Sequence, residues 1–233
     1  ETIESYKLEG QRELKIQLPR NYDNSAKRLY PLVIVLDGDY LFEPVAGNID
    51  YQAYWEDIPD CIIVGVNQST TRTDDFFYDE DTYFPAHDGA AFYEFVAAEL
   101  VPYIEERYNA SDFRIIVGHD LSANFMNYFL FKDTPLFRAY IALSPDLAPM
   151  MSIRLKERLA IMEQETFYYM ATADADVKVL RNAIIECDAQ LKAIENQALR
   201  YKFDNFEDAN HYSLVGRGIP KALNEIFSLY KPI

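Results

Sequence analysis

Short runs of apolar residues recur along the chain, and they limit the folds it can adopt more than any other feature. Each run is apolar at successive positions, which is typical of strands covered by helices on both faces. The runs occupy residues 31–36, 62–66, 113–118, 139–144 and 166–171. Between them, apolar side chains recur at helical spacing in residues 90–108, 124–132 and 177–195. The alternation predicts an α/β fold, with a mostly parallel sheet and helices on both faces.

The two ends of the chain extend this pattern. Residues 13–18 alternate apolar and polar side chains, which predicts a half-buried antiparallel strand ahead of the parallel ones. Residues 199–206 are predicted as the last strand and residues 218–230 as a closing helix. No repeat or Gly/Ser-rich linker interrupts the 233 residues, of which 49% are hydrophobic. Such a chain can bury one sizeable core, so we predict a single domain over residues 1–233.

Composition excludes several classes of function. The chain has 22 Lys and Arg residues against 38 Asp and Glu, a formal net charge of −16, which gives no attraction to nucleic-acid phosphates. Its three histidines lack metal-ligand spacing, and Cys61 and Cys187 lie in no Cys/His cluster. We therefore predict no metal and no cofactor, and the fold needs no disulfide. The chain contains no run of 18 apolar residues, so no transmembrane segment is predicted.

One predicted strand runs directly into a turn that is typical of a catalytic site. Ligands of parallel α/β sheets bind beyond the carboxyl ends of the strands. After the strand at 113–118 the chain continues as Gly118-His119-Asp120-Leu121-Ser122 and then as a helix. Small residues two before and two after the apex, in this context, indicate a nucleophile elbow. Its apex, Asp120, is expected to project above the sheet, with the amide of Leu121 facing any bound anion.

With this turn, several motifs resemble the putative esterase family of α/β-hydrolases, which includes the esterase D and enterochelin esterase types. They are LPRNY at 18–22, YPLVIVLDG at 30–38, VGV at 64–66, ELVPYIE at 99–105, FRAYIALSP at 137–145 and NHYS at 210–213. The resemblance implies the α/β-hydrolase fold and a small-molecule substrate or ligand. It also implies a bacterial protein that is periplasmic or exported, and otherwise the protein would be cytoplasmic. Residues 146–165 leave room for about one helix, so the cap is minimal or absent.

The elbow departs from the family, whose pattern is G-H-S-x-G. Asp120 replaces the nucleophilic serine and Ser122 replaces the second glycine. By position, the resemblance assigns His211 as the base. It assigns the Leu121 amide as one oxyanion donor and the segment of Gly38 and Asp39 as the other. The orienting acid is Asp174 or Asp176, in the chain order nucleophile, acid, histidine.

An aspartate at the apex changes the chemistry that can follow. Attack on an ester carbonyl by the ionised Asp120 would form a mixed anhydride and place a second negative charge beside the first. Attack on a saturated carbon, as in haloalkane dehalogenases and epoxide hydrolases of this fold, would form an alkyl ester that His211 and water can cleave. Leu121, however, stands where those dehalogenases keep a tryptophan. General-base action of Asp120 on water, and an inactive scaffold that binds a ligand or partner, remain alternatives.

Three further residues are candidates for substrate contact. Arg72 matches a family loop that faces the substrate, although it could instead pair with Asp74 or Asp75 at the surface. Tyr78 lies in an acidic, aromatic loop at 74–84, which would disfavour anionic substrates. His119 belongs to the elbow, where a structural role competes with substrate contact.

These observations together predict an esterase-like hydrolase of a small neutral substrate, acting through Asp120 and His211. Carboxylates crowded around His211 would hold it protonated and weaken it as a base. The alternative is a catalytically inactive scaffold with a binding role. Ordinary serine esterase activity is not expected, and the sequence does not predict an oligomeric state.

Overall fold

The computed structural model describes residues 1–230 and divides the chain into two compact units. The first unit extends from Glu1 to Arg114, and the second begins at Ile115. Strand β5 (Ala110–His119) contains the boundary. Among the described residues no helix is long and apolar enough to cross a membrane.

The first unit contains a sheet with the order β1-β2-β4-β3. Its strands are β1 (Thr2–Ser5), β2 (Gly10–Gln17), β3 (Tyr30–Val35) and β4 (Ile62–Val66). Strand β2 runs antiparallel to both β1 and β4, whereas β3 and β4 are parallel. Every residue of β3 and β4 is buried, as the continuous apolar runs predict.

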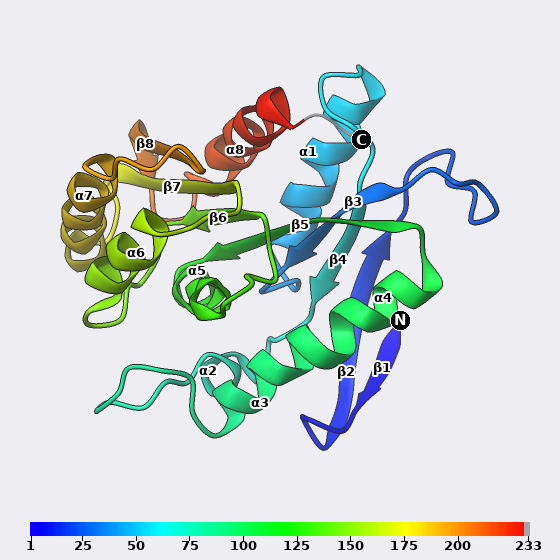
Figure 1. Ribbon diagram of the computed structural model, residues 1–233, viewed down its shortest axis with the longest axis horizontal. Helices are drawn as coiled ribbons and strands as arrows, with labels where there is room; N and C mark the ends of the chain where they lie inside the picture. The colour runs from blue at the N-terminus through cyan, green and yellow to red at the C-terminus, as the bar shows by residue number, and fades with distance from the viewer. Residues whose placement is uncertain (231–233) are drawn as a thin grey trace. The chain divides into compact units, whose positions relative to one another are not determined.

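Helices of the first unit follow its parallel strands. They are α1 (Phe42–Tyr54), α2 (Arg72–Asp75), α3 (Asp88–Glu94), the π-helical turn η1 (Phe95–Leu100) and α4 (Val101–Arg107). Helix α1 packs closely on β4, because Gly65 leaves room for the ring of Phe42. The last three segments form one continuous helical run (Figure 1). The π-helical turn ends at Leu100, two residues before Pro102, which has no N–H to continue the regular hydrogen-bond pattern.

The second unit contains four parallel strands in the order β5-β6-β7-β8. After β5 these are β6 (Ala139–Leu143), β7 (Thr166–Ala175) and β8 (Leu199–Asn210). The pairing of β7 with β8 shifts register between Ala173 and Ala175. This irregularity lies at the carboxyl end of β7, where polar residues of the candidate site begin.

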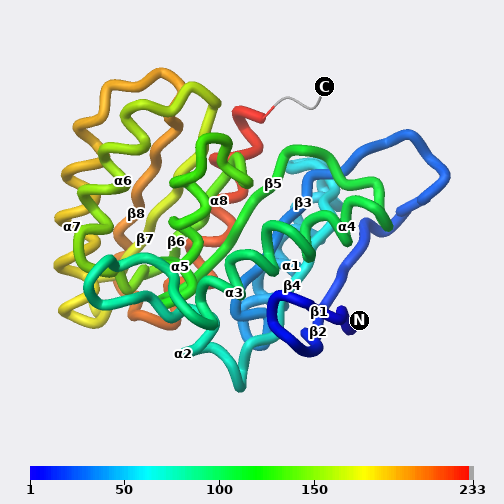
Figure 2. The backbone as a smooth tube through the Cα atoms, turned by 60° about the horizontal axis from the view of Figure 1, so that its bottom comes forward, coloured from blue at the N-terminus to red at the C-terminus, as the bar shows by residue number. Residues whose placement is uncertain are grey.

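Helices cover both faces of the second unit's sheet. They are α5 (Leu121–Phe125), the 3₁₀ segment η2 (Met126–Phe131), α6 (Met151–Ala160), α7 (Lys178–Lys192) and α8 (Val215–Leu229). Helices α6 and α7 lie on one face and α8 on the other (Figures 1 and 2). Helix α8 approaches closely at Gly218, where an added Cβ would lie 2.7 Å from Leu143 Cδ2.

The structure confirms the predicted alternation and corrects parts of it. The strand predicted at 13–18 is β2, but β1 was not predicted and takes the edge position. Helix α1 was also missed, and the helix predicted at 124–132 is mainly 3₁₀. One helix, α6, fills the segment between β6 and β7, as its length predicts. Cys61 and Cys187 are both buried free thiols.

Candidate active site

The turn between β5 and α5 has the backbone geometry of a nucleophile elbow. Asp120 adopts φ 60° and ψ −120°, a conformation that L residues rarely take and that clusters at functional sites. Two residues before it, a Cβ on Gly118 would lie 2.7 Å from backbone atoms of Ser122 and Ala123. Only glycine fits there, because the strand and the helix nearly touch.

Ser122 closes the elbow from within. Its hydroxyl accepts a hydrogen bond from the amide of His119 and donates one to the His119 carbonyl, both at 2.9 Å. The residue is fully buried. The Ser122 side chain therefore bonds to the turn itself and does not face solvent.

Asp120 is fixed by its backbone and keeps a partly exposed side chain. Its amide donates to Leu143 O, and its carbonyl accepts from the amide of Asp146, both at 3.1 Å. Its side chain is 24% exposed. Burial, and then the negative charge of Asp120, raise the pKa of the half-buried Asp146. The carboxyl group of Asp146 is thus close enough to Asp120 for the two to interact electrostatically.

His211 follows the end of β8 and is buried. The loop is held by Asn210, whose side-chain oxygen accepts the amides of Tyr212 and Ser213. His119 Nε2 donates to the carbonyl oxygen of His211 at 2.9 Å, and the two rings lie 4.5 Å apart. His119 is 3% exposed, so its observed contacts serve to hold the His211 loop. Its predicted substrate contact stays a prediction.

The two nitrogens of His211 face carboxylates from different loops. Nδ1 lies 2.9 Å from Asp176 Oδ1, and Nε2 lies 3.9 Å from Asp120 Oδ1. Sequence reasoning left Asp174 and Asp176 as equal candidates for the orienting acid. Asp174 instead accepts hydrogen bonds from Arg181 and Asn205. The structure thus brings Asp120, His211 and Asp176 together and leaves Asp174 apart.

Asp176 is held as an ionised carboxylate. Burial alone would raise its pKa, but hydrogen bonds from His211, Ser144 and Thr172 hold the pKa well below the usual range. Ser144 and Thr172 both donate to Oδ2 at 2.7 Å. The amide of Val177 donates to Oδ1 at 2.8 Å. Sequence reasoning missed Ser144 and Thr172, although Ser144 lies in the quoted family motif at 137–145.

The predicted second oxyanion donor belongs to the first unit. The Gly38 amide donates to Val66 O at 2.7 Å, and a Cβ on Gly38 would lie 2.8 Å from the backbone of Gly65 and Val66. Close packing thus explains why residue 38 is glycine, and the hydrogen bond to Val66 occupies its N–H group. Of the predicted pair, Asp39 is the remaining candidate, and its side chain accepts the amide of Gln68. The Leu121 amide, the other predicted donor, belongs to the first residue of α5.

Arg72 pairs with Asp37, an acid that sequence reasoning did not consider. Its guanidinium forms two hydrogen bonds, at 2.7 and 3.1 Å, with the buried carboxylate of Asp37. The hydroxyl of Tyr40 donates to the same carboxylate. Arg72 therefore braces the segment that precedes Gly38 and Asp39. A direct contact with substrate stays a prediction.

The acidic loop is less uniform than its sequence suggests. Asp75 is buried and forms a two-pronged ion pair with Arg12, so it is not part of an exposed acidic surface. Tyr78 forms an isolated bridge with Pro85, and its ring lies 6.3 Å from that of Tyr83. The substrate role of Tyr78 stays a prediction.

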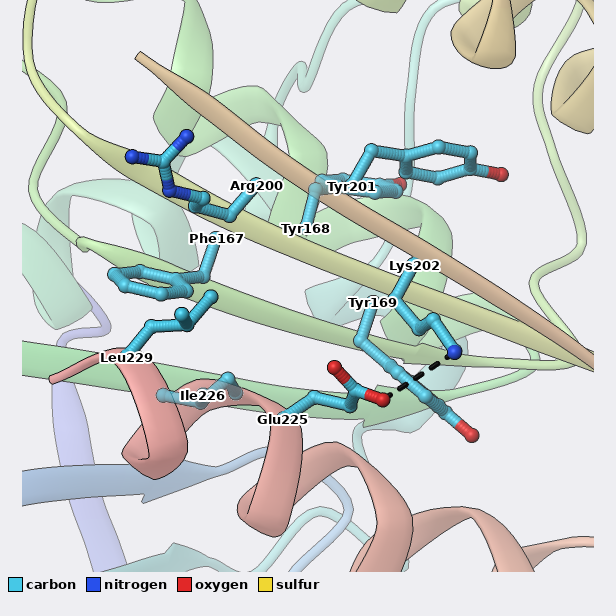
Figure 3. Close-up of a pocket in the computed structure, with 9 residues that line it drawn as sticks. All are labelled: Phe167, Tyr168, Tyr169, Arg200, Tyr201, Lys202, Glu225, Ile226 and Leu229. Atoms are coloured by element: carbon cyan, nitrogen blue, oxygen red, sulfur yellow. Dashed lines mark ion pairs between the residues drawn. The ribbon is translucent and has the colours of Figure 1, made fainter. Parts of the chain in front are cut away.

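Two hollows lie in the second unit. A small one of about 110 Å³ lies between β7, β8 and α8, where Phe167, Ile226 and Leu229 form apolar walls (Figure 3). Lys202 and Glu225 form an ion pair 3.3 Å apart at its side (Figure 3). A wider one of about 530 Å³ is lined by residues that flank Asp176 and His211, among them Asp174, Glu207 and Ser213. Within residues 1–230, no cluster of His, Cys, Asp and Glu could hold a metal ion.

The chain is similar to solved α/β-hydrolases over its whole length. It is 31% identical to an uncharacterised protein from Capnocytophaga ochracea, with a TM-score of 0.90, and the match covers 100% of this chain and 64% of that one. The chain thus spans less than two thirds of that structure. It is 24% identical to an IroE-like serine hydrolase from Shewanella oneidensis, with a TM-score of 0.85 and coverage of 98% and 79%.

A third structure extends the comparison to a distant relative. Siderophore hydrolase EstB from Aspergillus nidulans is 15% identical, with a TM-score of 0.78 and coverage of 100% of this chain and 96% of that one. No curated protein matches the chain. These likenesses show the α/β-hydrolase fold. The family model described as Putative esterase matches residues 5–199, and the chain belongs to that family.

Proposed function

We propose that the protein hydrolyses small neutral esters, with Asp120 as a general base on water and His211 as the acid. The observation that supports this most is the arrangement of Asp120, His211 and Asp176. The Nδ1 atom of His211 contacts the Asp176 carboxylate, and its Nε2 atom faces the Asp120 carboxylate. It retains the histidine and the acid of a hydrolase triad. At the apex, an aspartate stands where a serine esterase has its nucleophile.

The two carboxylates favour the charged form of His211 because each lies on one side of the ring. An imidazolium cannot accept a proton, but it can donate one. Asp120, in turn, needs no base to become ionised. The roles of acid and base are therefore exchanged relative to a serine esterase, in which the neutral histidine begins as the base.

The reaction then needs no covalent intermediate on the protein. Asp120 takes a proton from water while the water oxygen bonds to the ester carbonyl carbon, and the amide of Leu121 stabilises the resulting oxyanion. As the carbon–oxygen bond breaks, His211 gives its Nε2 proton to the leaving alkoxide. The proton on Asp120 then returns to His211. The products are a carboxylic acid and an alcohol, and both side chains regain their starting forms.

A binding role without turnover is the alternative. The 3.9 Å between His211 Nε2 and Asp120 Oδ1 exceeds hydrogen-bond length, so the two groups attract each other as an ion pair only when His211 is protonated. Hydrogen bonds of catalytic groups are often long before substrate binds. An ion pair of this kind would also stabilise the fold of an inactive scaffold.

Incubation with neutral alkyl and aryl esters, epoxides and alkyl halides in ¹⁸O-labelled water separates these functions. We expect ester hydrolysis that places one labelled oxygen in the acid product and none in Asp120 after many turnovers. Label in Asp120, detected by mass spectrometry of its peptide, would instead show covalent attack by the aspartate. Absence of turnover of every class would support the binding role.

A further inference from the structure

Ser144 is a buried hydroxyl group in a strained conformation beside His211. It directly follows β6 and adopts φ 44°, which is rare for a residue other than glycine. Its amide donates to Ala171 O at 2.8 Å, and no part of the residue is exposed. A buried residue keeps such a conformation only where its surroundings require it.

The hydroxyl of Ser144 lies between two partners and has one proton to give. Its oxygen is 2.7 Å from Asp176 Oδ2 and 2.9 Å from His211 Nδ1. Asp176 is ionised and can only accept, so the Ser144 proton belongs to Asp176. The Ser144 oxygen then offers only lone pairs to Nδ1. A proton on Nδ1 satisfies both that oxygen and Asp176 Oδ1.

We propose that Ser144 is a positioning residue that fixes Nδ1 of His211 as a proton donor and so keeps Nε2 directed at Asp120. The hydrogen-bond pattern stands by itself, while its catalytic meaning rests on the function proposed above. Without a proton on Nδ1, the nitrogen lone pair would face the oxygens of Asp176 and Ser144. The neutral form protonated only on Nε2 is therefore excluded.

Asp176 alone would hold the ring less firmly. It offers His211 one oxygen, and a ring held at one point can tilt about that bond. Ser144 adds a second acceptor for the same proton and also bonds to the other carboxylate oxygen. Thr172 makes a bond of the same length to Asp176 Oδ2, without the second contact to Nδ1 that Ser144 makes. The Thr172 hydroxyl is thus a matched control.

The test is the Nδ1 proton of His211, observed by NMR in protein labelled with ¹⁵N-histidine and assigned with a His211→Gln variant. We expect a protected, low-field Nδ1–H resonance in the wild type and in Thr172→Val. In Ser144→Ala, exchange of this proton with water should become about tenfold faster, the effect of losing one hydrogen bond of ordinary net strength. Ser144→Gly removes the same hydroxyl and relieves the positive φ, and it should behave alike.

Unchanged exchange in both Ser144 variants, with native folding confirmed by circular dichroism, would overturn the proposal. An equal acceleration in Thr172→Val would also overturn it, because the effect would then act through Asp176 alone. The measurement needs no substrate, so its result does not depend on whether the protein hydrolyses esters. If ester hydrolysis is found, Ser144→Ala should lower kcat about tenfold and leave KM unchanged.

Discussion

Asp176 Oδ1 lies 2.9 Å from His211 Nδ1 and the Asp176 side chain is fully buried, whereas Asp174, two residues earlier, pairs with Arg181 at 3.2 Å. In a regular strand these two aspartates would share a face. Strand β7 ends at Ala175, and its register with β8 shifts after Ala173. This local irregularity directs one carboxylate to the histidine and leaves the other at the surface.

Asp120→Ser is expected to create serine esterase activity. In the proposed site, the new serine would complete a hydrolase triad with His211 and Asp176, and its hydroxyl would supply the nucleophile. Hydrolysis of a p-nitrophenyl ester should rise at least about 10²-fold over the wild type. Asp120→Ala, which removes the charge without supplying a nucleophile, is the control. Equal rates for the two variants would show that more than the nucleophile differs from an active esterase.

In the Asp120→Ser background, the two candidate acids should separate clearly. Adding Asp176→Asn should lower kcat by about 10²–10⁴-fold, because the amide cannot stabilise the imidazolium and favours the wrong ring tautomer. Adding Asp174→Asn should leave kcat within about twofold, since its partners are Arg181 and Asn205. A larger loss for Asp174→Asn than for Asp176→Asn would reverse the assignment.

Stability should depend on pH through Asp176. Hydrogen bonds from His211, Ser144 and Thr172 outweigh burial and lower its pKa in the folded protein. An acid whose folded pKa lies below its unfolded value, about 3.9, stabilises the fold above that pH. This contribution is lost as the pH falls further. Urea unfolding at pH 3 and pH 7 should therefore show a smaller pH effect in Asp176→Asn than in the wild type.

Asp174 provides the comparison for that experiment. Its pKa is also lowered, first by Asn205 and then by Arg181, but the group is exposed and salt screens such pairs. At high salt, Asp174→Asn should show the wild-type dependence on pH. If Asp176→Asn also keeps the full dependence, its carboxylate does not contribute as described.

The elbow should tolerate no side chain at Gly118. A Cβ there would lie 2.7 Å from the backbone of α5, so Gly118→Ala should lower the free energy of unfolding by at least about 2 kcal/mol. Gly47, exposed inside α1, has no atom within 4 Å of an added Cβ. Gly47→Ala should therefore stabilise the protein by about 0.5–1 kcal/mol. Similar losses in both variants by chemical denaturation would contradict the close packing at the elbow.

The sequence predicts those elements whose side-chain pattern is unambiguous. The buried strands β3 to β7 follow from short continuous apolar runs rich in β-branched and aromatic residues, which favour strands over helices. Helix α1 was missed because its sequence, with glycine, proline and several aromatics, has no strong helical signal. Strand β1 is short, and it lies at the edge of the sheet beside β2.

The candidate site shows a similar division. Asp120 and His211 can be predicted because each lies in a motif of consecutive residues, and the structure brings them within 3.9 Å. The choice between Asp174 and Asp176 depends on the end of β7, which the pattern does not encode. Ser144 contacts His211 only because β6 and the loop after β8 meet in three dimensions. The hydrogen bond from the Gly38 amide to Val66 likewise depends on how the strands pack.

The rate of ester hydrolysis by Asp120→Asn tests the central claim most directly. The substitution keeps the shape of the side chain and removes the charge that would accept a proton from water. For the neutral ester cleaved fastest by the wild type, kcat/KM should fall at least about 10²-fold, the usual contribution of a general base. A variant that keeps kcat/KM within about twofold of the wild type would contradict the role of Asp120 as the base.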